Sequence, residues 1–315
     1  MSQRLKVGVV GVGSLGQWHA DKYSRLDSAE LVGVYDVNPA RAGEIAAKYK
    51  TKTFDTVEAL AGVIEAASVA VPAEHHFKVA SLLMDRGIRL MVEKPIASTT
   101  DQAETMVRLA EKKGLILQVG HIERFNPVMK YLEEILHAPK FIESVRLSPY
   151  PVPAAGATAR GTDVSVVHDL MIHDLEIILH LVRSPIKELH AIGVPVLSAT
   201  EDIANVRLCF VSGCVANVTA SRISVKGIRK IRVFQESTYV SLDYQNQSGE
   251  LYRKTEKGIS MEQVPIEKSD PLADELKTFV QCVLNRDKPV VSGRHASDAL
   301  RLAVEICECI RKGGS

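Results

Sequence analysis

The sequence has almost no excess of charge of either sign. Its 315 residues include 39 Lys and Arg and 38 Asp and Glu, which gives a formal net charge of +1. Proteins dedicated to nucleic-acid binding usually carry a strong basic excess. We therefore expect no nucleic-acid partner, although a single anionic ligand in a local pocket is compatible with this balance.

Long apolar runs are also absent. No stretch approaches the roughly 18 uncharged apolar residues of a membrane-spanning helix. The first residues lead directly into a strand pattern, without the apolar region and cleavage site of a signal peptide. We expect a cytoplasmic protein without a membrane partner.

Cysteine is scarce, with five residues in the chain. Their number is odd and their spacing is not that of a disulfide scaffold or a zinc site, which predicts free thiols in a reducing compartment. They are Cys209, Cys214, Cys282, Cys307 and Cys309.

The remaining composition is that of an ordinary globular protein, with 46% hydrophobic and 24% charged residues. At about 150 residues per domain, the length predicts roughly two domains. A chain of this size can bury its core without disulfides or a structural metal.

Short apolar runs alternate with amphipathic stretches over the first part of the chain. The run at 5–11 is continuously apolar and closed by glycine, which is typical of a parallel strand buried on both faces. The alternation predicts a doubly wound parallel sheet with helices on both faces. Strands are predicted at 5–11, 31–35, 66–71, 88–92 and 115–119, and helices at 15–26, 39–49, 76–86 and 100–113.

The pattern changes after residue 138, where β-prone runs follow one another with short turns. Strands without intervening helices predict an antiparallel sheet. These strands are predicted at 141–149, 187–196, 204–210, 215–223, 230–236 and 239–244, with helices at 165–182, 272–285 and 296–311. We therefore expect an α/β Rossmann domain at 1–122 and an α+β domain with a large, open, mostly antiparallel sheet at 123–315.

The first predicted strand runs into a G-x-G-x-x-G turn formed by Gly11, Gly13 and Gly16. Asp36 follows Gly16 by 20 residues, at the end of the second strand, which is the spacing of a dinucleotide-binding fingerprint. Gly11 makes the tight turn, Gly13 lets the backbone approach a pyrophosphate, and Gly16 lets the helix pack closely on the strand. A glycine turn that binds no ligand is the alternative, and the placement of strand, helix and acid argues against it.

The helix start after this turn, at Ser14 and Leu15, should expose backbone N–H groups that bind the diphosphate. Asp36 would accept hydrogen bonds from the adenosine ribose and repel a 2′-phosphate, so NAD is favoured over NADP. Arg41 is expected to be a solvated helix residue rather than a phosphate clamp.

Three further motifs extend the pattern over the whole chain. They are Val92-Glu93-Lys94-Pro95, Gly120-His121-Ile122-Glu123-Arg124-Phe125-Asn126-Pro127 and His168-Asp169-Leu170-Met171-Ile172-His173-Asp174. With the glycine turn, they resemble the glucose-fructose oxidoreductase, inositol dehydrogenase and MocA family (Gfo/Idh/MocA). The resemblance implies a nicotinamide-dependent enzyme that oxidises or reduces a sugar or cyclitol carbon. It also implies a C-terminal domain that binds substrate and whose open sheet forms the interface of a homodimer or homotetramer.

Within this family, the R-F-N-P run and the D-L-M-I-H-D helix most resemble the branch acting on nucleotide sugars. Within that branch, they are similar to the UDP-N-acetylglucosamine 3-dehydrogenases. The sequence departs from many relatives at Glu176, where they carry a further Asp.

Lys94 follows a predicted buried strand at the carboxyl edge of the parallel sheet, where ligands bind in open α/β sheets. Position alone leaves a solvated lysine and a functional lysine equally open. The resemblance implies that Lys94 is catalytic, because chemistry at an alcohol or ketone needs a proton partner. It also implies that Glu93 and Lys94 itself lie at the cofactor.

The helix predicted at 165–182 has two distinct sides when residues are placed about 100° apart. Asp169 and His173 are four residues apart and therefore neighbours on its surface. A carboxylate beside an imidazole fixes the tautomer of the ring and raises its basicity. The apolar side carries Val167, Leu170, Met171, Leu175, Ile178 and Val182, and the polar side carries Asp169, His173, Glu176 and His180.

A polar helix face is often merely solvated, and we expect this for Glu176 and His180. For His173 the resemblance implies a general base, oriented by Asp169. His168 lies about 140° around the helix from His173, so the two do not readily share a metal. Two ligands alone do not make a metal site, and we expect none.

Other candidates lie outside these motifs or at their ends. Pro72 and His76 follow the strand at 66–71, and the resemblance implies that they contact the cofactor while His75 points elsewhere. Arg124 and Asn126 are candidates for substrate binding, and a domain-linking salt bridge is the alternative for Arg124.

Two weaker sets of charged residues complete the candidates. The Pro/Gly/Ala-rich stretch 148–163 contains Arg160 and Asp163, which are minor candidates for substrate binding. A basic cluster, expected to be a solvated turn and strand edge, consists of Lys226, Arg229, Lys230 and Arg232.

Together these features predict an NAD-dependent oxidoreductase that transfers hydride between nicotinamide and a secondary alcohol or ketone of a nucleotide sugar. His173 would take the hydroxyl proton, and Lys94 would bind the same oxygen and stabilise its charge or relay the proton. The sequence does not separate these two roles. The alternatives are a dehydrogenase of free polyols such as inositol and a non-catalytic nicotinamide sensor that regulates a partner.

Overall fold

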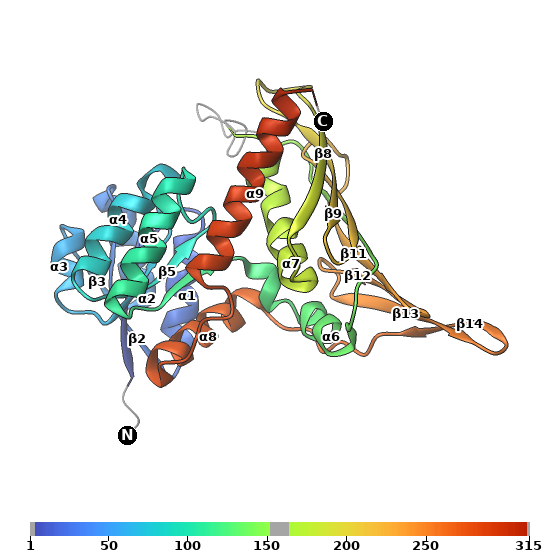
Figure 1. Ribbon diagram of the computed structural model, residues 1–315. Coiled ribbons are helices and arrows are strands. Elements are labelled where there is room, and N and C mark those ends of the chain that lie inside the picture. Colours follow the sequence, from blue (N-terminus) through green and yellow to red (C-terminus); the bar gives the residue numbers. More distant parts are fainter. Residues whose placement is uncertain (1–3, 152–163, 314–315) are drawn as a thin grey trace. The chain divides into compact units, whose positions relative to one another are not determined.

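The computed structural model describes residues 4–151 and 164–313. The chain divides into two compact units, one formed by Met1–Phe125 with Asp270–Ser297 and the other by Asn126–Ser269 with Asp298–Ser315. Each is a separate fold built around its own sheet (Figure 1).

The first unit contains a six-stranded sheet in the order β3-β2-β1-β4-β5-β6, and every neighbouring pair is parallel. This is the strand order of a Rossmann fold, so the predicted doubly wound domain is confirmed. The strands are β1 (Leu5–Val10), β2 (Ala29–Tyr35), β3 (Lys52–Thr53), β4 (Ala66–Val69), β5 (Arg89–Glu93) and β6 (Leu117–Gly120).

Local signals set the ends of several helices in this unit. Asn38 caps α2 by accepting hydrogen bonds from two backbone N–H groups, and Pro39 follows at the first helical position. Thr99 caps α5, which ends at Gly114 in the left-handed conformation. The helices are α1 (Gly16–Arg25), α2 (Pro39–Tyr49), α3 (Val57–Ala61), α4 (Ala73–Asp85), α5 (Thr100–Lys113), the short 3₁₀ helix η1 (Ile122–Phe125) and α8 (Pro271–Asn285).

The helix α8 belongs to the first unit although it is distant in sequence. Leu276, Phe279 and Val280 are fully buried in the core that contains Val7 and Val9 of β1. We expected residues 270–297 in the second domain, because an amphipathic pattern shows that a helix has a buried face but not which core it joins.

The second unit contains an eight-stranded sheet in the order β14-β13-β12-β11-β7-β10-β9-β8. The pair β7 and β10 is parallel and the other neighbours are antiparallel, as the predicted mostly antiparallel sheet requires. The strands are β7 (Phe141–Leu147), β8 (Ile186–Val194), β9 (Ile203–Phe210), β10 (Val215–Ser221), β11 (Ile228–Gln235), β12 (Thr238–Asp243), β13 (Ser248–Thr255) and β14 (Gly258–Gln263).

One face of this sheet packs against helices. The core is formed by alternate strand residues with α6 (Pro127–Ile135), α7 (Ile172–Val182) and the later part of α9 (Gly293–Arg311). The opposite face carries a row of four aromatic rings on adjacent strands, with centroids 5.9, 4.9 and 4.2 Å apart from one ring to the next. The row consists of Phe141, Phe234, Tyr239 and Tyr252.

None of the helices that the structure describes combines the length and apolarity needed to cross a bilayer.

Candidate active site

The glycine turn connects β1 to α1, and its three glycines serve different purposes. Gly11 has φ +83°, and a Cβ there would lie 2.8 Å from the backbone nitrogen of Val71. A Cβ on Gly16 would lie 1.8 Å from the carbonyl oxygen of Gly11. A Cβ on Gly13 would meet nothing within 4 Å, so the space beside this glycine is open.

The N-terminus of α1 lacks a side-chain cap. Leu15, its N-cap residue, makes no side-chain capping hydrogen bond, whereas Asn38 and Thr99 cap α2 and α5. Gly13 and Ser14 are exposed beside this helix start. The helix dipole and the N–H groups of a first helical turn favour an anion such as a diphosphate at this position.

Asp36 directly follows β2 and lies beside the glycine turn. Its Oδ2 accepts a hydrogen bond from the Val12 backbone N–H at 2.8 Å, and its Oδ1 accepts one from the Asn38 N–H at 2.9 Å. Each carboxylate oxygen can accept a further bond, and the fixed negative charge disfavours a 2′-phosphate. The position and charge of this carboxylate therefore fit the ribose of NAD.

Arg41 is not the solvated helix residue that we expected. Its side chain is 25% exposed, and its guanidinium donates to the Val12 carbonyl at 3.0 Å and to Gln17 Oε1 at 2.9 Å. Arg41 therefore ties α2 to the glycine turn. A tertiary contact of this kind leaves no mark in the local sequence.

The variant Asp36→Asn should weaken NAD binding by about tenfold, because a neutral amide replaces a charged acceptor for the ribose. NADP binding should weaken less or improve, since the repulsion of a 2′-phosphate is removed. Titration of both cofactors measures the ratio of dissociation constants. The exposed Asp27→Asn is the control, and an unchanged ratio in Asp36→Asn would contradict this role.

The E-K-P motif lies at the carboxyl end of β5, at the same edge of the sheet as the glycine turn. Glu93, Lys94 and Pro95 are half-buried, and the Lys94–Pro95 peptide bond is cis. The Lys94 backbone N–H donates to Glu93 Oε2 at 3.3 Å. A Cβ on Gly120 would lie 3.0 Å from that oxygen, so the end of β6 leaves room for the Glu93 carboxylate.

His76 lies beneath this edge and is buried, whereas its neighbour His75 is exposed. The two ring nitrogens of His76 lie 2.7 Å from the Pro95 carbonyl and 2.9 Å from the Val71 carbonyl. Burial lowers the pKa of His76, and the two carbonyls oppose that shift by favouring the protonated ring. His76 thus holds together the segments that follow β4 and β5, while Pro72 precedes α4.

His121 follows β6 and was given no role in our interpretation of the sequence. It is 1% exposed, and burial, followed by the nearby positive charge of Lys94, lowers its pKa to about 3. A neutral imidazole therefore lies next to the lysine at neutral pH. The sequence signal that could have identified His121 is its position in the G-H-I-E-R-F-N-P run, directly after the end of a strand.

A buried acid, Glu275 of α8, lies beneath the same part of the sheet. It is 1% exposed, and neither carboxylate oxygen has a hydrogen-bond partner among the described residues. Burial, with a smaller effect of Glu93, raises the pKa of Glu275 well above its usual value. The folded protein therefore holds a proton here that the unfolded chain releases above about pH 4.5.

The variant Glu275→Gln should be more stable than the wild type at pH 7 and equally stable near pH 4. A folded-state pKa above the unfolded value means that wild-type stability falls as the pH rises, by up to about 1.4 kcal/mol per unit. The amide does not titrate, so it removes this dependence. Urea unfolding at both pH values tests this, and equal stability at pH 7 would contradict it.

The second unit presents Asp169 and His173 on the segment that leads into α7. This segment opens with a π-helical turn, Val167–Met171, before the regular helix Ile172–Val182. Periodicity of side chains predicted the helix but not the wider first turn, a feature often found at functional sites. Asp169 and His173 are both half-buried.

A buried ion pair fixes α7 on its sheet next to His173. The carboxylate of Asp174 accepts a hydrogen bond from Arg146 Nε at 2.7 Å and another from Ser144 Oγ at 2.8 Å. Arg146 and Asp174 are 3% and 2% exposed. A fully hydrogen-bonded pair of this kind limits rotation of the helix that carries His173.

The other polar residues of this helix are buried or contact neighbouring side chains. Glu176, expected on a solvated face, is 2% exposed, so the polar side of the predicted helix is partly buried. His180 Nε2 is 2.8 Å from Glu133. His168 Nδ1 lies 3.6 Å from Cys307 Sγ, and burial lowers its pKa.

Arg124 and Asn126, the candidates for substrate binding, are 8% and 3% exposed. Asn126 caps α6 through its Oδ1 and donates from Nδ2 to the Tyr244 carbonyl at 3.0 Å. Its amide is therefore engaged within its own unit. Arg160 and Asp163 lie outside the described residues.

The basic cluster Lys226, Arg229, Lys230 and Arg232 is exposed, as expected. Among residues 4–151 and 164–313, no group of three or more His, Cys, Asp or Glu side chains is arranged to hold a metal ion.

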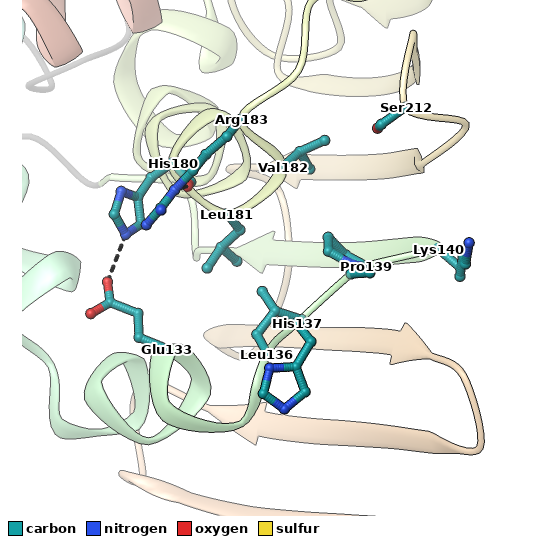
Figure 2. Close-up of a pocket in the computed structure, with 11 residues that line it drawn as sticks. Glu133, Leu136, His137, Pro139, Lys140, His180, Leu181, Val182, Arg183 and Ser212 are labelled. Carbon is teal, nitrogen blue, oxygen red and sulfur yellow. Dashed lines mark hydrogen bonds and ion pairs between the residues drawn. The ribbon is translucent and has the colours of Figure 1, made fainter.

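A pocket of about 440 Å³ lies in the second unit, where α6 and α7 end (Figure 2). Leu136 and Leu181 line its middle, and Lys140 stands at the opposite end from the paired Glu133 and His180. Ligand sites usually bring polar groups to a common point. The lining includes none of the residues predicted for cofactor binding or catalysis.

Comparison with known proteins adds an independent line of evidence. Residues 5–121 match the family model described as an oxidoreductase family with an NAD-binding Rossmann fold (Gfo/Idh/MocA), and residues 138–239 match the C-terminal domain of the same family. UDP-N-acetylglucosamine 3-dehydrogenase from Acidithiobacillus ferrooxidans is 34% identical, over 96% of this chain and 97% of its own.

Its solved structure superimposes with a TM-score of 0.92 at 32% identity, over 98% of both chains. The myo-inositol 2-dehydrogenase of Thermotoga maritima is more distant, at 25% identity over 95% of this chain and 94% of its own.

Proposed function

The chain belongs to the Gfo/Idh/MocA family of NAD-binding oxidoreductases, and on this premise we propose that it oxidises a secondary hydroxyl, or reduces the corresponding ketone, of a UDP-N-acetylglucosamine-like nucleotide sugar. The observation that carries the proposal is the 34% identity to a UDP-N-acetylglucosamine 3-dehydrogenase over 96% of the chain. The inositol dehydrogenase relative, at 25% identity, keeps free polyols as the second candidate.

The first unit supplies the cofactor site. Gly11, Gly13 and Gly16 shape the turn, the N–H groups at Ser14 and Leu15 bind the diphosphate, and Asp36 binds the ribose. Bound NAD supplies a nicotinamide ring that exchanges hydride with the substrate carbon. Glu93, Pro72 and His76 form the surroundings of this ring at the carboxyl edge of the sheet.

Proton transfer is assigned to Lys94, His173 and Asp169. His173, oriented by Asp169, takes the proton of the substrate hydroxyl as a general base. Lys94 donates a hydrogen bond to the same oxygen and stabilises its developing negative charge, or relays its proton. Arg124, whose planar guanidinium suits phosphates, binds the substrate with Asn126 nearby.

The second unit supports association between copies of this chain. The sheet face that no described helix covers carries the stacked aromatic row with partly exposed rings, and aromatic residues are enriched at protein interfaces. A homodimer or homotetramer through this sheet covers the row.

The variant Tyr239→Glu should shift the assembly toward the monomer, because it places a charge in the middle of the aromatic row. Light scattering after gel filtration measures the mass in solution. Thr255→Glu, at the end of β13, is the matched control and should leave the assembly intact. A monomeric wild type would contradict the assembly.

The function is tested by mixing the protein with NAD and UDP-N-acetylglucosamine and following the absorbance of reduced nicotinamide. A ketone trap or stoichiometric enzyme compensates for an unfavourable equilibrium. Turnover with the nucleotide sugar but not with free inositol supports the proposal, as does measurable binding of UDP. Turnover with inositol alone moves the assignment to free polyols, and NAD binding without turnover on any sugar supports a sensor.

A further inference from the structure

Four side chains of the first unit form a continuous buried chain of hydrogen bonds. His19 Nε2 lies 2.9 Å from Glu93 Oε1, and His19 Nδ1 lies 2.9 Å from Ser68 Oγ. The Tyr23 hydroxyl lies 2.9 Å from the same Ser68 oxygen. His19, Ser68 and Tyr23 are at most 1% exposed, and the Glu93 side chain is 12% exposed at the end of the chain.

The direction of each hydrogen bond among these four side chains follows from Tyr23, the last member of the chain. Ser68 is the single hydrogen-bond partner of the Tyr23 hydroxyl among the described residues, and burial raises the pKa of Tyr23. The phenol therefore keeps its proton and donates it to Ser68. Ser68 then donates to His19 Nδ1, and His19 donates from Nε2–H to Glu93. The His19 tautomer with its proton on Nε2 therefore gives each of the four side chains a suitable donor or acceptor.

This chain holds the Glu93 carboxylate in one orientation. Burial disfavours its charged form, but His19, together with Lys94 and His76, holds the pKa of Glu93 below its usual value. One oxygen binds His19, and the other accepts the Lys94 backbone N–H over Gly120. The result is a fixed negative charge next to Lys94.

Other titratable groups surround this charge and are part of any pH response. His121 follows β6, His76 lies on α4, and Glu275 acts from α8. Burial lowers the pKa of both histidines, to about 3 for His121, and raises that of Glu275, so burial favours the neutral form of all three. Glu93, Lys94, Arg124 and His295 also act electrostatically on His121 at this point of the edge.

We propose that His19 is a positioning residue for the reaction, and that with Ser68 and Tyr23 it holds the Glu93 carboxylate in the orientation that presents Lys94 to the substrate oxygen. This inference rests on the proposed function, because it gives His19 a role through a catalytic Lys94. It does not depend on which sugar is oxidised.

The first test compares His19→Leu and His19→Gln. Leucine removes both hydrogen bonds, and we expect kcat to fall about 10–100-fold, as for other side chains that orient a reacting group. Without the His19 donor, Glu93 protonates at higher pH, so the acid limb of the kcat profile should move upward by about one unit. Glutamine retains an N–H donor near the position of Nε2 and should restore most of kcat and the wild-type limb.

The second test changes Tyr23, the member of the hydrogen-bonded chain that lies farthest from Glu93. Tyr23→Phe removes the hydroxyl that fixes the direction of the bonds, and it should move the acid limb in the same direction by a smaller amount. Tyr49→Phe is the matched control, because Tyr49 packs against the same core and its hydroxyl is not in the chain. Energy transfer from Trp18, the one tryptophan of the sequence, to reduced nicotinamide shows that each variant still binds cofactor.

A purely structural role for His19 would lower the yield or thermal stability of His19→Leu without moving the acid limb, and that result would overturn the proposal. Nitrogen NMR of labelled histidine reads the His19 tautomer without turnover, and a ring protonated on Nδ1 near pH 7 would also overturn it. An inactive wild type with the expected tautomer would instead overturn the proposed function, and with it the role given to His19.

Discussion

Replacing Lys94 with alanine should lower turnover about 10²–10⁴-fold, and replacing His173 with alanine should have an effect of similar size. Each variant removes a group that holds or moves a proton at the substrate oxygen, so kcat should fall while NAD affinity changes little. Steady-state kinetics with saturating NAD measures kcat, and energy transfer from Trp18 measures cofactor binding.

Matched controls separate chemistry from folding. Lys78 is exposed on α4, and His180 lies on the same helix as His173 in an exposed ion pair with Glu133. Lys78→Ala and His180→Ala should both retain near wild-type turnover. Full activity of both Lys94→Ala and His173→Ala would contradict the proposed mechanism, and equal loss of NAD binding and turnover would point to a cofactor role for Lys94.

Much of the Rossmann domain could be predicted because its strands are short, continuously apolar and separated by well-capped helices. Asn38 and Pro39, for example, mark the start of α2 in the local sequence. The helix α6 was not predicted, although Asn126 and Pro127 mark its start in the same way. Other elements that were not predicted lack such signals. The strand β3 has 2 residues and α3 has 5, which is too short for a periodic pattern. The strand β14 alternates apolar and polar residues over 259–262, but all of its residues are exposed, so it has no buried face.

The cofactor site could be predicted for the same reason, since its glycines and Asp36 form a local motif. The chain of hydrogen bonds beneath Glu93 could not be predicted from the sequence. His19 is 49 residues from Ser68 and 74 residues from Glu93, so their contact exists only in the folded sheet. The burial of Glu176 was missed because helix periodicity separates polar from apolar sides but does not show what covers either side.

The variant Gly16→Ala should abolish detectable NAD binding, with a loss of at least about 100-fold, or about 2.7 kcal/mol. Its Cβ would lie 1.8 Å from the Gly11 carbonyl oxygen and 3.3 Å from the Ala70 Cβ. Because these atoms are backbone or a short side chain, the glycine turn and the start of α1 must move apart. The moved N–H groups no longer meet the diphosphate, and the loss of close packing should also lower the melting temperature.

Two other glycines make this prediction specific. Gly13→Ala meets no protein atom within 4 Å, so it should fold like the wild type and still weaken NAD binding, because its Cβ enters the space of the pyrophosphate. Gly43→Ala, inside α2 and also unobstructed, should bind NAD normally and gain about 0.5–1 kcal/mol of stability. Thermal unfolding with cofactor titration distinguishes the three. Wild-type binding by Gly16→Ala would mean that close approach of α1 to the turn is not what forms the diphosphate site.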